Sequence, residues 1–204
     1  MTNPMIALIE QRVSANLFDA THELADAQIE ELVRLATRAP TAYNLQNWRF
    51  IAVRTPEGKA RLRRLAYGQA KVLEAAVTFI VIGQHPDHRA LAERLRPFVD
   101  TGLMHAETAS GWQESVRTQY ADAKAARDEA VRSATLGAAT LIYAAEAQGL
   151  STGPMGGFDA DGVSREFDLG PDEVPVMLLA VGRAATGNWP QKSRRATGEV
   201  LHFS

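Results

Sequence analysis

The stretch ATLGAATLIYAAEAQGLSTGPMGGF, residues 134–158, decides the fold of this chain. Between Ala134 and Gln148 the only charged residue is Glu146, and small residues fill most of the positions. A helix without a polar face is buried on nearly all sides, and small side chains let neighbouring backbones approach it closely. We therefore expect this helix at the centre of the domain, at a subunit contact, or at both. Gly149 is expected to end it as a C-terminal cap.

The segment that follows the helix, Gly153 to Phe158, reads GPMGGF and is predicted to be a glycine-rich loop. Glycine has no side chain in front of its backbone N–H group, so a flat or anionic ligand can come close to such a segment. An ordinary glycine-rich turn has the same composition. The segment by itself leaves both interpretations open.

The composition indicates one globular domain of 204 residues, with 46% hydrophobic and 23% charged residues. Lys and Arg number 22 against 24 Asp and Glu, so the net charge of −2 gives no general attraction to nucleic acid or acidic membranes. The absence of cysteine excludes disulfides, thiolate metal sites and cysteine nucleophiles, and redox chemistry would need a bound cofactor. Without a leader-like or membrane-spanning apolar run, the cytoplasm is the expected compartment.

Hydrophobic spacing predicts helices and strands along the rest of the chain. Asp26 is expected to cap a helix that Pro40 closes. Apolar, β-branched runs predict strands at 49–53, 78–82 and 174–182. Residues 85–130 are expected to be helical and interrupted, with breaks that include Pro97 and Gly111. The histidines of this region lack a metal-binding motif, so they are interpreted as surface residues and no metal site is expected.

Three polar segments could bind a ligand. Arg12 and Ser14 alternate onto one side and could offer a guanidinium and a hydroxyl to a phosphate. Residues 40–46 (PTAYNLQ) gather hydroxyls and amides, and amides can read the edge of a heteroaromatic ring. Three cations lie within residues 192–195. The plainer interpretations are a surface arginine, a polar loop held by its own side chains, and a solvated tail.

Taken in chain order, these motifs resemble the FMN-dependent nitroreductase family over nearly the whole sequence. The matching elements are Arg12-x-Ser14, Ala39-Pro40-Thr41-x-x-Asn44-x-Gln46-x-Trp48-x-Phe50, Gln69, Gly153-Pro154-Met155-Gly156-Gly157-Phe158-Asp159, and Lys192-Ser193-Arg194. Each motif is weak alone, and the five in family order are specific. The resemblance implies an α+β fold, with a mixed or antiparallel central sheet flanked by helices, assembled as an intertwined homodimer.

The resemblance also implies where FMN would bind. The phosphate would be held by Arg12, Ser14, Lys192 and Arg194. The flavin would be reached, from the other subunit or at its edge, by the loop that carries Pro40, Thr41, Asn44 and Gln46. Gln69 would bind the pyrimidine side of the ring. Backbone donors would come from Pro154, Met155, Gly156 and Gly157, with the N–H groups of the two glycines directed at flavin N5 and O4.

The chain departs from the family pattern at Asn16, where relatives usually carry Lys or Arg. In the family that cation stabilises negative charge at N1 and O2 of the reduced flavin. Asn16 can still donate a hydrogen bond, so the resemblance predicts FMN binding with a lower reduction potential. Gly156 occupies a position that is Glu in some relatives, which implies a more open and less acidic site above the ring.

The implied activity is reduction of nitroaromatics, quinones or activated carbonyls, with NADH or NADPH as electron donor, by a ping-pong exchange through one site. Tyr43 is a candidate proton donor, and a packing role fits it equally well. The same motifs fit a specialised flavin enzyme, such as an enal or semialdehyde reductase or a dehydrogenase. Two other classes remain open: a flavin-binding protein without turnover, and a helical interaction protein without a cofactor.

Overall fold

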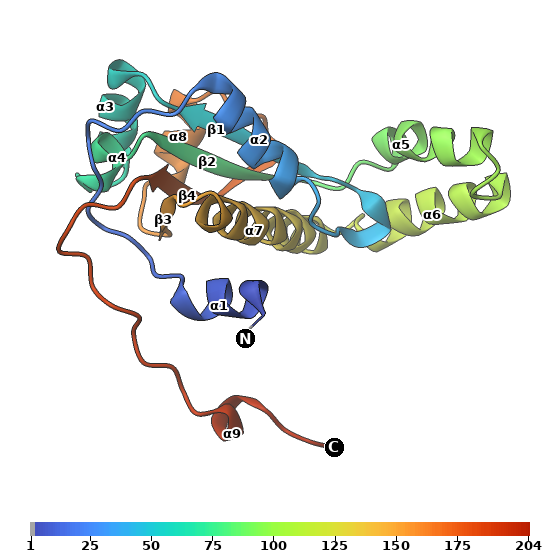
Figure 1. Ribbon diagram of the computed structural model, residues 1–204. Coiled ribbons are helices and arrows are strands. Elements are labelled where there is room, and N and C mark those ends of the chain that lie inside the picture. The colour runs from blue at the N-terminus through green and yellow to red at the C-terminus, as the bar shows by residue number, and fades with distance from the viewer. Residues whose placement is uncertain (1–2) are drawn as a thin grey trace.

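The computed structural model describes residues 3–204, which form a four-stranded sheet with helices on both faces (Figure 1). The elements in chain order are α1 (Pro4–Gln11), α2 (Asp26–Ala36), the 3₁₀ helix η1 (Ala42–Asn44), β1 (Trp48–Val53), α3 (Pro56–Leu65), α4 (Lys71–Glu74), β2 (Val77–Gln84), α5 (His88–Asp100), α6 (Ala106–Gln119), α7 (Ala123–Ala147), β3 (Ser151–Met155), α8 (Ala160–Glu166), β4 (Glu173–Gly182) and α9 (Thr197–Val200). The predicted α+β class is confirmed.

The sheet has the order β1-β2-β4-β3, and every neighbouring pair is antiparallel. β2 is buried along nearly its whole length because helices cover both of its faces, which explains its continuous apolar sequence. Among the described residues, the isolated bridge between Ser14 and Thr152 is the parallel pairing, so the sheet of one protomer is antiparallel rather than mixed. The predicted loop at Gly153–Phe158 is wrong in its first half, since β3 continues to Met155 and pairs with β4.

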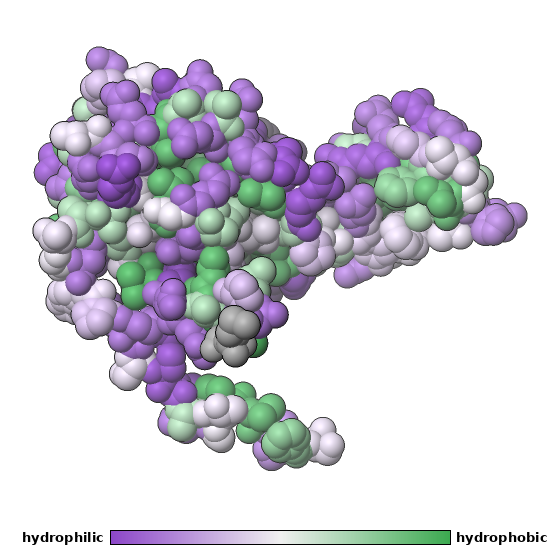
Figure 2. Space-filling model, viewed as in Figure 1, coloured by the Kyte–Doolittle hydropathy of each residue, from purple (hydrophilic) through white to green (hydrophobic). Residues whose placement is uncertain are grey.

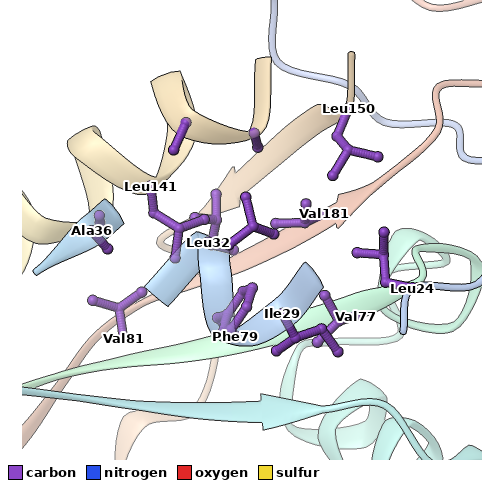
Figure 3. Close-up of a cluster of buried hydrophobic side chains, with 14 of the residues drawn as sticks. Leu24, Ile29, Leu32, Ala36, Val77, Phe79, Val81, Leu141, Leu150 and Val181 are labelled. Atoms are coloured by element: carbon purple, nitrogen blue, oxygen red, sulfur yellow. The ribbon is translucent and has the colours of Figure 1, made fainter. Parts of the chain in front are cut away.

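The helix predicted at the centre is α7, which begins earlier than expected, at Ala123, and packs with α2 against one face of the sheet (Figure 3). Its small residues allow a close approach: a Cβ on Gly137 would lie 3.3 Å from the ring of Trp48. Gly149, at φ +72°, ends the helix as predicted. The face of α7 that points away from the sheet is less buried than the sequence suggested, since Leu136 of this helix is 40% exposed.

A second core fills the other face of the sheet. The buried side chains there come from α3, α4 and α8 on one side and from β2 and β4 on the other, and they include Leu62, Val72, Ile80, Ile82, Val163 and Leu178. Both faces of the sheet therefore pack against helices.

Helices α5 and α6 pack against each other and project from the sheet as an arm (Figure 1). The breaks predicted at Pro97 and Gly111 are wrong, because both residues lie inside helices. Pro97 is exposed, so water can bind the carbonyl that loses its helical partner. At the base of the arm the Tyr120 hydroxyl donates to Glu129 of α7 at 3.2 Å, and burial, followed by the Glu129 charge, raises the pKa of Tyr120 to about 12.

Asp26 does not cap α2 as predicted. It is the first helical residue, and the N-cap is Ala25, whose N–H donates to the side chain of Gln28 at 3.0 Å. The Gln28 side chain, one turn into the helix, therefore satisfies the N–H of the N-cap residue itself, as the N3 residue of a capping box does.

After β4 the chain leaves the sheet as an extended tail that carries the short helix α9 (Figure 1). Trp189 is 67% exposed and Phe203 is 86% exposed, and the apolar end of the tail stands clear of the body in Figure 2. Within residues 3–204 no helix is both long enough and apolar enough to cross a membrane.

Candidate functional site

The N-terminal segment that carries Arg12 and Ser14 is fixed against the strand that leads to the glycine pair. Ser14 bridges Thr152, and the backbone N–H of Ala15 donates to the Thr152 carbonyl at 2.8 Å. A Cβ on Gly153 would lie 2.4 Å from the Ala15 carbonyl oxygen, so glycine is required for this contact. The Arg-x-Ser motif and the glycine-rich segment, far apart in sequence, therefore lie side by side.

Two amide side chains of the tail tie it to the same segment. Asn188 Oδ1 accepts the backbone N–H of Asn16 at 2.7 Å and that of Leu17 at 3.0 Å. Gln191 Nε2 donates to the Arg12 carbonyl at 2.8 Å. The sequence interpretation missed Asn188 and Gln191, because an isolated uncharged amide in a tail carries no recognisable signal before its partners are known.

These bonds bring the residues that were predicted to bind a phosphate around one small hollow, which we call the anion cavity. It has a volume of about 60 Å³, and its lining includes Arg12, Ser14, Asn16, Lys192 and Arg194 but no carboxylate. Arg12 Nη1 lies 3.4 Å from Ser14 Oγ, so both groups face the same space. Cationic and hydroxyl donors around a hollow of this size suit a compact anion such as a phosphate group.

A fourth cation stands beside the cavity and was not predicted. Lys71 Nζ donates to Asn16 Oδ1 at 3.1 Å. Burial lowers the pKa of the Lys71 ammonium, and the positive charge of Lys192 lowers it further. The expectation that Asn16 leaves this side of the site without a positive charge is therefore wrong, since Lys71 supplies one from α4. Lys71 lies two residues after Gln69, and this proximity in the sequence was the signal that could have identified it as a site residue.

Gln69, two residues before this lysine, is bonded to the segment that carries the two glycines, Gly156 and Gly157. Gln69 Nε2 donates to the Gly157 carbonyl at 2.9 Å. A Cβ on Gly156 or Gly157 would meet no atom within 4 Å, so the packing of the chain does not require glycine there, and the space in front of both is open. Pro154 and Met155 precede them in β3; the Met155 side chain is buried in the second core, and it contributes backbone alone to this surface.

The loop with Pro40, Thr41, Asn44 and Gln46, which we call the amide loop, has a different character. Asn44 and Gln46 adopt left-handed backbone conformations with φ of +57° and +47°, as does Tyr43 at +51°. Such a conformation costs about 1–2 kcal/mol for an ordinary residue and less for asparagine. Inside the loop, Thr41 Oγ1 accepts the backbone N–H of Gln46 at 3.0 Å.

Tyr43 anchors the amide loop to the arm. Its hydroxyl donates to Gln119 Oε1 at 3.1 Å, and its ring meets that of Trp112 edge to face with centroids 5.7 Å apart. Trp112 therefore packs at the base of the arm. The hydroxyl of Tyr43 is occupied by its hydrogen bond to Gln119, which favours the packing role over that of a proton donor.

The structure does not bring the amide loop to the anion cavity within one protomer. The loop lies where the arm meets the body, whereas the anion cavity is near α1 and the start of the tail (Figure 1). In the part of the chain that the structure describes, no hydrogen bond joins the two regions. One protomer thus presents two separate halves of the predicted site.

Known proteins share this arrangement of sequence and fold. The profile of the Nitroreductase family matches residues 9–183. YodC of Bacillus subtilis (strain 168), provisionally named an NAD(P)H nitroreductase, is 32% identical over 184 residues, which cover 90% of this chain and 91% of YodC. The NADH dehydrogenase of Thermus thermophilus is 33% identical over 163 residues, covering 79% and 78% of the two chains.

Two solved structures have the same fold as this chain. The provisionally assigned nitroreductase ydfN of Bacillus subtilis superimposes with a TM-score of 0.92 at 27% identity, covering 98% of both chains. A provisionally assigned nitroreductase of Exiguobacterium sibiricum 255-15, solved in complex with FMN, superimposes with a TM-score of 0.90 at 26% identity, covering 100% of this chain and 99% of the other.

Proposed function

The chain belongs to the nitroreductase family of oxidoreductases, and on this premise we propose that it binds FMN and uses NADH or NADPH to reduce small electrophiles such as nitroaromatics, quinones or activated carbonyls. The observation that carries the proposal is the anion cavity, which is lined by Arg12, Ser14, Lys192 and Arg194. Its N-terminal segment bridges β3, the strand that leads to the open pair Gly156 and Gly157. The cavity has the chemistry to bind a phosphate, and the glycine pair has the chemistry to bind the flat ring system attached to it.

The residues around the cavity would bind the two ends of FMN differently. Arg12 and Arg194 offer planar forks of donors to phosphate oxygens, while Lys192 adds a point charge. Gly156 and Gly157 offer backbone N–H groups to the N5 and O4 edge of the ring. The free amide oxygen of Gln69 would accept from the pyrimidine edge, since its nitrogen is already bonded to Gly157.

Hydride transfer, first from NADH or NADPH to the ring and then from the ring to the electrophile, is the chemistry that FMN supplies when bound. The contribution of the chain is position and charge. Lys71 and Asn16 would stabilise the negative charge that reduction places at N1 and O2, because an ammonium close to a developing anion lowers its energy in a partly buried site. The open space at Gly156 would admit nicotinamide and electrophile in turn, in a ping-pong exchange in the cytoplasm.

We further propose that two copies of the chain complete the site as an intertwined homodimer. The amide loop and the anion cavity lie apart in one protomer, and a second copy would supply the missing half of each site. The exposed apolar residues of the tail, α1 and α7 give such an association a driving force; they include Ile6, Leu136, Trp189, Val200 and Phe203. An extended tail that leaves its own sheet is suited to wrapping a partner.

A visible spectrum of the freshly purified protein tests this function, followed by anaerobic addition of NADH or NADPH. We expect a retained flavin spectrum, bleaching by the nicotinamide, and recovery on adding a quinone or nitroaromatic. Protein that stays colourless after incubation with FMN would refute the cofactor assignment. Bound flavin that neither nicotinamide can bleach would instead indicate a flavin-binding protein without turnover.

A further inference from the structure

The amide loop receives one hydrogen bond from a charged side chain, and that side chain belongs to the arm. Arg94 of α5 donates through Nη1 to the carbonyl oxygen of Leu45 at 2.5 Å. Leu45 has ordinary helical torsion angles, φ −60° and ψ −32°, but stands between the left-handed residues Asn44 and Gln46. The reversals of backbone hand on either side turn its carbonyl out of the loop, toward the arginine.

The side chain of Leu45 is held by the same helix. It is fully buried and shares a cluster with Leu91 and Leu95 of α5, and Arg94 lies one helical turn after Leu91. Helix α5 therefore holds both the side chain and the carbonyl of Leu45. The hydrogen bond to the carbonyl involves an ionised donor, which makes it stronger than a neutral one.

On this side the loop borders a cleft of about 570 Å³, and Asn47 and Arg94 both contribute to the lining of that cleft. Asn47 donates to the Gln84 carbonyl at 2.8 Å and so fixes the end of the loop. Arg94 reaches across the edge of the cleft and binds the Leu45 carbonyl in the loop. Without the guanidinium, the Leu45 carbonyl could turn to water in the cleft, and the left-handed residues could relax.

We infer that Arg94 is a positioning residue, which holds the left-handed residues Tyr43, Asn44 and Gln46 in their conformation so that Asn44 and Gln46 present their amides to the flavin. This inference rests on the proposed function. It makes the arm a determinant of flavin binding even though Arg94 itself has no part in the anion cavity. Movement of α5 would move the Leu45 carbonyl, and with it both amides.

Hydrogen exchange of the flavin-free full-length protein tests the positioning role without relying on catalysis. In Arg94→Met, which keeps the apolar stem but removes the donors, the N–H groups of Leu45 and Gln46 should exchange on the order of tenfold faster than in the wild type, because a charge-assisted bond is lost. Arg94→Lys should give an intermediate rate. Arg96→Met is the matched control: Arg96 is an exposed arginine on the same helix, and its replacement should leave these rates unchanged.

FMN titration of the same variants tests the consequence for the site. Arg94→Met should weaken FMN binding several-fold and alter the visible circular dichroism of the bound flavin, while Arg96→Met should do neither. Unchanged exchange and unchanged FMN affinity in Arg94→Met would overturn the inference. If exchange accelerates but the wild type binds no FMN, the proposed function fails and the structural role of Arg94 stands.

Discussion

The anion cavity and the amide loop differ in how each is held together. The cavity is charged, and none of the residues of its two segments, 12–16 and 188–194, has a positive φ. It is formed by hydrogen bonds between the tail and the N-terminal segment, in which Asn188 accepts the backbone N–H of Asn16 and Gln191 donates to the Arg12 carbonyl. The amide loop is uncharged and contains three left-handed residues, and helices of the arm hold it in place. We therefore propose that the cavity contributes most of the affinity for FMN and that the loop contributes its orientation.

The largest effect should come from removing a charge from the cavity. Arg12→Ala should weaken FMN binding by about 10- to 100-fold, because one charge-assisted phosphate contact contributes about 1.5–3 kcal/mol. Equilibrium titration of the flavin-free protein measures this, with Arg96→Ala, at an exposed arginine of α5 outside the motifs, as the control. Equal affinities for the wild type and Arg12→Ala would remove the arginine from the site.

A smaller effect is expected at the cation beside Asn16. Lys71→Gln should lower the two-electron reduction potential of the bound flavin by about 30 mV, which corresponds to about 1.4 kcal/mol of lost stabilisation of the reduced ring. Asn16→Lys should raise it by less, because Lys71 already occupies that side. Potentiometric titration of both variants and the wild type measures these shifts in the reduction potential. A potential that is unchanged in Lys71→Gln and strongly raised in Asn16→Lys would show that Lys71 does not compensate for the residue at position 16.

The lowered pKa of Lys71 also predicts a pH dependence. Burial and Lys192 make the ammonium lose its proton at a lower pH than an ordinary lysine. Because an anionic ligand favours the protonated form, the affinity for FMN should fall as the pH rises toward the usual lysine range. Lys71→Gln should lack this component. Identical pH profiles for the two proteins would contradict the assignment.

The smallest effect should appear in the amide loop. Gln46→Gly relieves a left-handed conformation, so the free energy of unfolding should stay unchanged or rise by up to about 1 kcal/mol. The lost amide should weaken FMN binding only a few-fold, as expected for a neutral hydrogen bond. Denaturant unfolding and FMN titration measure the two quantities. Marked destabilisation would show that the Gln46 side chain supports the fold rather than the ligand.

The sequence predicted those features that depend on local pattern. The strands at β1, β2 and β4, the central helix and its end at Gly149 follow from apolar periodicity and glycine chemistry. The Arg-x-Ser motif and the basic tail were identified by residue type, and the structure brings them together. The errors at Pro97 and Gly111 arise because an exposed helix tolerates a residue that local rules treat as a break.

The features that escaped prediction depend on contacts between distant segments. Lys71 reaches Asn16 only because α4 packs beside the N-terminal segment. The pairing of β3 with β4 turned half of an expected loop into a strand, and the contact between Arg94 and Leu45 depends on how the arm returns to the body. No periodicity or motif in these residues specifies such partners.

The claim that two protomers share one flavin site is tested most directly by complementation. Arg12→Ala weakens binding at the anion cavity, and the double variant Asn44→Ala with Gln46→Ala removes both amides of the amide loop. After unfolding and refolding as an equimolar mixture, FMN binding is measured at a concentration just above the dissociation constant of the wild type. If the halves come from different protomers, each mixed dimer contains one intact site, and about a quarter of all sites should regain wild-type affinity. If both halves come from the same protomer, every site keeps a defect, and no site will regain wild-type affinity.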